Sequence, residues 1–142
     1  MSGGTLKVTT QYEGQKRFSG GDGEARVLMD ASTGAGGLGV AQTPKQLVLQ
    51  GLAGCTGLDV AAMLEKREIA FADFTLEVTA DLTKYFPQIF KKIHVTYRLR
   101  AAEEDRPVIE RAIVQSKERF CGVGAMLEKS AELTWELDLA PL

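Results

Sequence analysis

Five stretches of the chain have the length and residue pattern of β-strands. Apolar and polar residues alternate over residues 6–11, 74–82, 92–99 and 132–139, and a short extended run covers residues 25–30. The apolar positions of the three longest stretches are Phe74, Leu76, Val78, Ala80 and Leu82; Ile93, Val95, Tyr97 and Leu99; and Leu133, Trp135, Leu137 and Leu139. A period of two sends successive side chains to opposite faces, so these strands are predicted to be half-buried.

Two longer segments instead repeat apolar residues every three to four positions, which is the spacing of one face of an α-helix. The first covers residues 43–66 and opens with threonine and proline, a typical N-cap and first helical residue. The second covers residues 107–120, and a short third helix is predicted over residues 125–129. The resulting order, β-β-(β)-α-β-β-α-α-β, predicts an α+β fold with a single domain over residues 1–142.

Composition and charge narrow the classes of function. Hydrophobic residues make up 44% of the chain and charged residues 25%, which are the values of a globular protein. The net charge is −2 and no run of lysine and arginine resembles a basic patch, so nucleic acid is not expected as a partner. The chain has no eighteen consecutive apolar residues and no signal-peptide pattern, so we expect no membrane partner and a cytoplasmic location.

The first predicted helix is unusually thin near its middle, where Gly51, Ala53, Gly54 and Gly57 follow closely on one another. Glycine inside a helix costs up to about 1 kcal/mol relative to alanine. Several small residues together therefore indicate that another backbone approaches closely, and we expect this helix to be central. A chain of 142 residues offers few such neighbours, which favours an obligate dimer.

The two cysteines are the strongest candidates for chemistry. Cys55 lies on the apolar stripe of the first helix, where free cysteine is often a small, buried packing residue. Cys121 precedes Gly122 at the predicted start of the next helix, where the helix dipole and free N–H groups are expected to lower the pKa of the thiol. The two are far apart in the sequence and form no CxxC motif, so spacing alone does not decide between reactive and structural thiols.

Other features are weaker candidates. His94 stands alone on the polar face of a predicted strand, which favours a solvated residue over a metal ligand. The glycines of residues 20–23 and 34–39 match neither the dinucleotide-binding nor the phosphate-binding fingerprint and are interpreted as turns. The aromatic segment 84–90 either covers a pocket or packs against a neighbouring subunit. We therefore expect no metal and no bound cofactor.

Three motifs together resemble the OsmC/Ohr family, whose name refers to osmotic induction and organic hydroperoxide resistance. They are Thr43-Pro44 at the start of the long helix, the small-residue run Gly51-Leu-Ala-Gly-Cys55, and Phe120-Cys121 ahead of a short helix and the last strand. The resemblance extends over essentially the whole chain. Segments 55–66 and 126–129 look closest to the YhfA-like branch of the family.

The resemblance implies an OsmC-like fold in which antiparallel sheets wrap around central helices in an intertwined homodimer. It also implies a thiol peroxidase, in which Cys55 attacks the O–O bond of an organic hydroperoxide and becomes a sulfenic acid. Cys121 then condenses with the sulfenic acid to form a disulfide, which an external dithiol reduces. The expected partners are thus a small hydroperoxide, a dithiol reductant and a second copy of the chain.

The chain departs from the family pattern in two places. Lys45 follows Pro44, where active members carry a glutamate, and the glycines 20–23 lack the family arginine. A reactive thiolate needs a nearby cation, and Arg17, Arg26 and Lys45 are the candidates for that role.

Two other functions stay open on sequence grounds. The same departures favour a non-catalytic OsmC-like homodimer that binds a small molecule or senses redox state. A third interpretation leaves both cysteines structural. Proximity of the two sulfurs is the observation that separates these hypotheses, because a disulfide needs Cα atoms closer than about 7 Å.

Overall fold

The computed structural model describes residues 3–142, which divide into two compact units between Val48 and Leu49. The first unit contains a three-stranded antiparallel sheet of β1 (Thr9–Gly14), β2 (Arg17–Asp22) and β3 (Ala25–Asp30). The strand predicted over residues 25–30 is confirmed as β3, whereas the first strand begins at Thr9 and not at residue 6. The single domain over residues 1–142 stays a prediction.

The glycines of residues 20–23 differ from the expectation of a turn. Gly20 and Gly21 lie within β2, and the chain reverses only after Asp22. A side-chain carbon at Gly21 would come within 1.9 Å of the backbone oxygen of Ala25 on β3. These glycines therefore allow β2 and β3 to approach closely. Clustered glycines occur both in turns and in strands that approach another backbone closely, so the sequence alone does not distinguish the two.

The long helix α1 (Pro44–Lys66) begins and ends where the sequence predicts. A capping box holds its first turn: the backbone N–H of Thr43 donates to Gln46 Oε1 at 2.9 Å, and the N–H of Gln46 donates to Thr43 Oγ1 at 3.3 Å. The reciprocal bonds satisfy N–H groups that a helix start otherwise leaves free.

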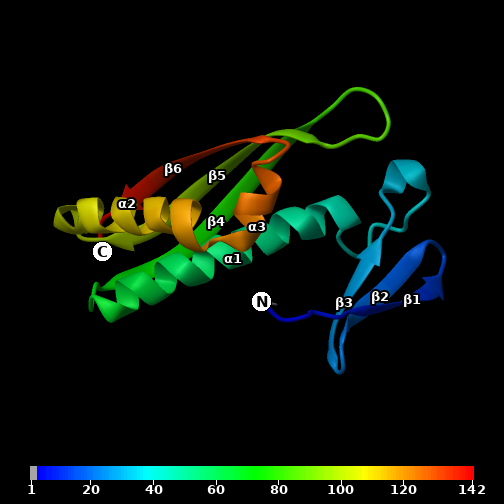
Figure 1. Ribbon diagram of the computed structural model, residues 1–142, viewed down its shortest axis with the longest axis horizontal. Coiled ribbons are helices and arrows are strands. Elements are labelled where there is room, and N and C mark those ends of the chain that lie inside the picture. The colour runs from blue at the N-terminus through cyan, green and yellow to red at the C-terminus, as the bar shows by residue number, and fades with distance from the viewer. Residues whose placement is uncertain (1–2) are drawn as a thin grey trace. The chain divides into compact units, whose positions relative to one another are not determined.

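The second unit is built on a sheet of β4 (Phe71–Leu82), β5 (Phe90–Ala101) and β6 (Glu132–Ala140), with β5 in the centre. β4 and β5 pair antiparallel, but β6 runs parallel to β5, so the expectation of antiparallel sheets throughout is wrong for this pair. The helices between β5 and β6 carry the chain back along the sheet, and β6 therefore starts at the same end as β5 (Figure 1). Parallel neighbours require such a crossover.

The crossover consists of α2 (Arg106–Gln115), a single π-helical turn (Ser116–Phe120) and α3 (Gly122–Leu127). The predicted helix 107–120 thus changes its hydrogen bonding for its last turn, and the short third helix starts earlier than residue 125.

The core of the second unit lies between this sheet and the helices α1 and α2, which pack on the same face (Figure 1). Alternate residues of β5 supply the sheet side of that core, as a period of two requires. The large apolar residues buried there are Leu52, Val60 and Leu64 of α1, Ile93, Val95, Tyr97 and Leu99 of β5, and Ile109 and Ile113 of α2. Packing against this core positions the side chains that α1 and the π-helical turn present.

Among the described residues, α1 is the one helix long and apolar enough to cross a membrane, by length and composition only. Within the chain, 22% of its most apolar window is buried. Thr56 and Asp59 of this helix are hydrogen-bonded to side chains of the second unit, which is the environment of a core helix. The absence of a membrane partner stays a prediction.

Candidate functional site

Cys55 lies in the middle of α1 and is half-buried. Leu52, before Cys55 on the same helix, and Val60, after it, face the core and fix the rotation of the helix. The thiol therefore stands at the edge of the packed face of α1, within reach of solvent.

Cys121 is the N-cap residue of α3, as its position before Gly122 predicts. Its Sγ accepts a hydrogen bond from the backbone N–H of Gly124 at 3.3 Å, and its backbone N–H donates to the carbonyl of Ser116 at 2.8 Å. Gly124 is buried, and a side-chain carbon there would lie 3.3 Å from the sulfur. The π-helical turn and α3 thus hold a thiol that is only 3% exposed.

The structure brings the two cysteines together, which sequence spacing does not predict. Both are free thiols, and Cys55 is close enough to Cys121 to contribute to the raised pKa of the Cys121 thiol. The helix-terminal position was expected to lower the pKa of Cys121, but burial raises it to about 11. The Gly124 N–H acts in the lowering direction, but loss of solvation, together with Cys55 and the negative charge of Asp59, outweighs it.

A chain of buried hydroxyl groups runs beside the thiol pair. Thr56 Oγ1 lies 2.7 Å from the Tyr97 hydroxyl and 2.8 Å from Ser116 Oγ, and Ser116 Oγ lies 2.8 Å from Asp59 Oδ2. A carboxylate only accepts, so Ser116 donates to Asp59, Thr56 donates to Ser116 and Tyr97 donates to Thr56. Burial raises the pKa of Tyr97, which keeps its proton available to donate.

This hydroxyl chain ties α1, β5 and the π-helical turn to one another. Sequence reasoning missed all four of its residues. The signal was weak: Thr56 follows Cys55 directly, and Ser116 precedes Cys121 by five positions. Only the packed fold shows that these neighbours share hydrogen bonds.

A cavity of about 20 Å³ borders Cys121 and has room for about one water molecule. Its wall includes the side chains of Lys117 and Trp135. Lys117 is a cation that the sequence did not single out, and its Nζ lies 3.6 Å from Glu128 Oε2.

The three predicted cations belong to the first unit, whereas both cysteines belong to the second. Arg26 Nη2 donates to the backbone oxygen and to Oγ of Ser19, both at 2.9 Å. Arg17 keeps a buried Nε without a hydrogen-bond partner, and its Nη2 reaches Gln15 at 3.4 Å. Lys45 is exposed in the first turn of α1. The role of each stays a prediction.

His94 lies on the face of the sheet that points away from the core. Its Nδ1 is 2.7 Å from Thr134 Oγ1 and its Nε2 is 3.0 Å from Glu136 Oε1. The hydrogen bond between His94 and Glu136 is the main cause that lowers the pKa of Glu136. The contacts are those of a surface residue that links two strands.

Known proteins share both the sequence pattern and the fold of this chain. The family model described as "OsmC-like protein" matches residues 34–136. Protein YhfA of Escherichia coli strain K12 is 28% identical over 109 residues, which are 77% of this chain and 78% of YhfA. The match to YhfA agrees with the branch that the sequence predicts.

Two solved structures illustrate the shared fold. The OsmC-like protein of Mycoplasma pneumoniae superposes with a TM-score of 0.77 at 16% identity, over 98% of this chain and 99% of that one. The organic hydroperoxide resistance protein OhrB of Bacillus subtilis superposes with a TM-score of 0.62 at 24% identity, over 94% and 97% of the two chains.

Proposed function

Because the chain belongs to the OsmC-like protein family, we propose that it is a thiol-dependent reductase of organic hydroperoxides that acts in oxidative-stress defence. Cys55 is the peroxidatic cysteine and Cys121 the resolving cysteine. The proposal includes a cytoplasmic location and an external dithiol as the reductant. Neighbouring structures named as organic hydroperoxide resistance proteins support the substrate class.

The observation that carries the proposal is the proximity of two chemically unequal thiols. Cys55 is half-buried and so accessible to a small peroxide, whereas Cys121 is buried behind it with a pKa of about 11. The buried thiol stays protonated near neutral pH and does not compete for peroxide, because the thiolate is the nucleophile. The unequal pair thus suits an attacking and a resolving cysteine.

The proposed reaction has two steps in the protein and one with the reductant. The Cys55 thiolate attacks one peroxide oxygen, the O–O bond breaks, an alcohol leaves after protonation, and Cys55 becomes a sulfenic acid. The Cys121 sulfur then attacks the Cys55 sulfur, an S–S bond forms, and the hydroxyl leaves as water. A dithiol reduces this disulfide by exchange and is itself oxidised.

Among the three predicted cations, Arg17 is our first candidate to stabilise the Cys55 thiolate. Its buried Nε has no hydrogen-bond partner, whereas Arg26 is already bonded to Ser19. An arginine keeps its charge when partly buried and offers several donors to a thiolate and a peroxide oxygen.

The proposed function predicts the fate of both thiols when one equivalent of an organic hydroperoxide, such as cumene hydroperoxide, is added to the reduced protein. Mass spectrometry should show one disulfide within the chain, between Cys55 and Cys121, and no remaining free thiol. In Cys121→Ser, Cys55 should accumulate as a sulfenic acid that a dimedone probe labels, because no resolving thiol is left.

Cys55→Ser is the matched control and should leave Cys121 reduced at the same peroxide dose. Two unreacted thiols in the parent protein would contradict the proposal and favour structural cysteines. A disulfide that forms once but is not turned over with dithiothreitol and excess peroxide would support the redox-sensing alternative instead.

We also propose that the protein is a homodimer. Gly51 and Gly54 of α1 have open space where a side chain would stand, and Leu58 on the same helix is 74% exposed. The sheet of the first unit likewise exposes Tyr12 and Val27. A three-stranded sheet needs an apolar face packed against another element to be stable, and a second copy of the chain offers one.

Sedimentation equilibrium at micromolar concentration should therefore show a dimer. Leu58→Glu, at an exposed position of α1, should shift the protein toward monomer, because a charge in an apolar interface is left unpaired. Glu104→Gln, at an exposed position outside α1, is the control and should leave the dimer intact. A parent protein that sediments as a stable monomer would refute the assembly.

A further inference from the structure

A cavity of about 400 Å³ opens between α1 and α2. Neither cysteine lines it. Its floor is apolar and consists of Met63, Leu64, Val108, Ala112 and Phe120. This volume is within the range of sites that hold small organic ligands.

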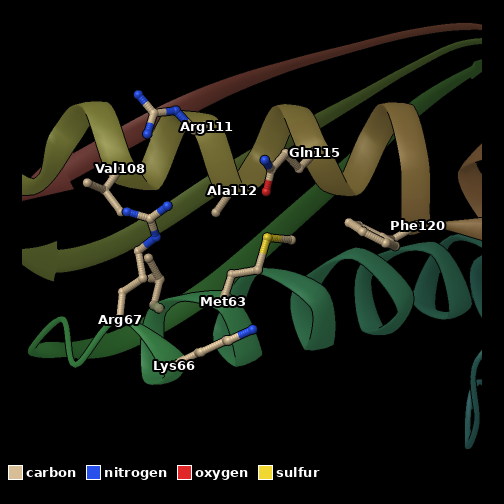
Figure 2. A pocket seen from close by; sticks show the side chains of 9 residues that line it. Met63, Lys66, Arg67, Val108, Arg111, Ala112, Gln115 and Phe120 are labelled. Atoms are coloured by element: carbon tan, nitrogen blue, oxygen red, sulfur yellow. The ribbon is translucent and has the colours of Figure 1, made fainter.

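Three cations surround the apolar floor: Lys66 and Arg67 from the end of α1, and Arg111 from α2. Figure 2 shows Arg67, directly after the end of α1, reaching toward Val108 of α2, with Arg111 above it, while Phe120 lies at the opposite end of the view. One end of the cavity is therefore cationic and the other aromatic.

The charge around this cavity is unbalanced. Its lining contains no acidic residue, although acidic residues outnumber basic ones in the whole chain, 19 to 17. Within residues 3–142 no ion pair engages Lys66, Arg67 or Arg111, whereas the neighbouring Arg106 pairs with Glu103 and Glu110.

A structural role explains only part of this arrangement. Lys66 and Arg67 complement the negative end of the α1 dipole. Arg111 lies within α2, where the dipole gives a cation no such advantage. A guanidinium at the rim of an apolar cavity, with no carboxylate of the protein beside it, is suited to a carboxylate supplied by a ligand.

From this combination we infer that the cavity between α1 and α2 binds a single-chain carboxylate amphiphile, of the fatty-acid type. The carboxylate lies between Arg67 and Arg111, and the aliphatic chain follows the apolar floor toward Phe120. The site goes beyond the proposed function, because it uses neither cysteine.

Isothermal titration of the full chain with dodecanoate, below its micelle-forming concentration, tests this inference. We expect saturable binding of one dodecanoate per chain, and no binding of dodecyltrimethylammonium, which has the same tail and the opposite charge. Arg111→Glu should weaken dodecanoate binding at least tenfold, because it replaces an attractive charge with a repulsive one. The position is exposed, so the substitution should not prevent folding.

Arg119→Glu is the matched control, because Arg119 is an exposed arginine outside the cavity lining. The affinity of this variant for dodecanoate should stay within about twofold of the parent's affinity. Cys55→Ser should also bind dodecanoate normally, which separates this site from the peroxidase chemistry. Equal affinity of Arg111→Glu and the parent, or equal binding of the cationic amphiphile, would overturn the inference.

Two further outcomes would overturn it. Tighter binding of dodecyl phosphate than of dodecanoate would reject the carboxylate assignment. A change of sedimentation in Arg111→Glu without a change of ligand affinity would show instead that this cavity is closed by a second copy of the chain.

Discussion

Formation of the disulfide should be about 100-fold faster at pH 9 than at pH 7. The pKa of Cys121 is raised to about 11, mainly by burial, so only about one molecule in ten thousand carries its thiolate at pH 7 and about one in a hundred at pH 9. The attack on the Cys55 sulfenic acid needs that thiolate. Cys121 stays buried after Cys55 is oxidised, so the rate of disulfide formation should still rise with pH.

Trp135 provides the signal for this measurement, because it is the one tryptophan of the chain and lines the same small cavity as Cys121. Stopped-flow fluorescence with excess organic hydroperoxide should show a fast phase for oxidation of Cys55 and a slower phase for disulfide formation. The slower phase should be absent in Cys121→Ser. A slower phase whose rate is the same from pH 7 to pH 9 would show that Cys121 does not react through a rare thiolate.

Replacing Thr56 by valine should lower the free energy of unfolding by about 2–4 kcal/mol. The two side chains have nearly the same shape, but valine leaves Tyr97 without its acceptor and Ser116 without its donor. Each buried polar group that loses its partner costs roughly 1–3 kcal/mol. Urea unfolding at one fixed protein concentration measures the change, since assembly contributes to apparent stability.

Two matched variants isolate the hydrogen-bond effect. Thr75→Val makes the same chemical change at an exposed position of β4 and should alter stability by no more than about 0.5 kcal/mol. Adding Tyr97→Phe to Thr56→Val removes the stranded hydroxyl and should recover about 1 kcal/mol. If Thr56→Val is as stable as the parent, the buried hydroxyl chain does not hold α1 against β5.

The two cysteines show how far sequence reasoning extends toward the site. Motif context selected both residues, and the position of Cys121 before Gly122 predicted a helix N-cap correctly. The predicted direction of its pKa was wrong, because the helix terminus acts locally whereas desolvation depends on everything packed around the sulfur. Their proximity and their unequal burial are tertiary properties that no local pattern contains.

The cavity between α1 and α2 was not predicted at all. Met63 and Val108 belong to ordinary apolar stripes, and Arg67 and Arg111 are ordinary surface charges in sequence. They become a candidate site only because α1 and α2 pack on the same face of one sheet.

Local and periodic information in the sequence determined the helix α1 with its capping box, the strands β4 and β5, and the family to which the chain belongs. Each depends on residues a few positions apart or on a repeated pattern. Only the tertiary structure decided that β6 runs parallel to β5, that Cys55 lies near Cys121, and that Thr56 and Asp59 both bond to Ser116. Those outcomes follow from the path of the crossover helices over the sheet, which brings together groups whose separation along the chain carries no signal.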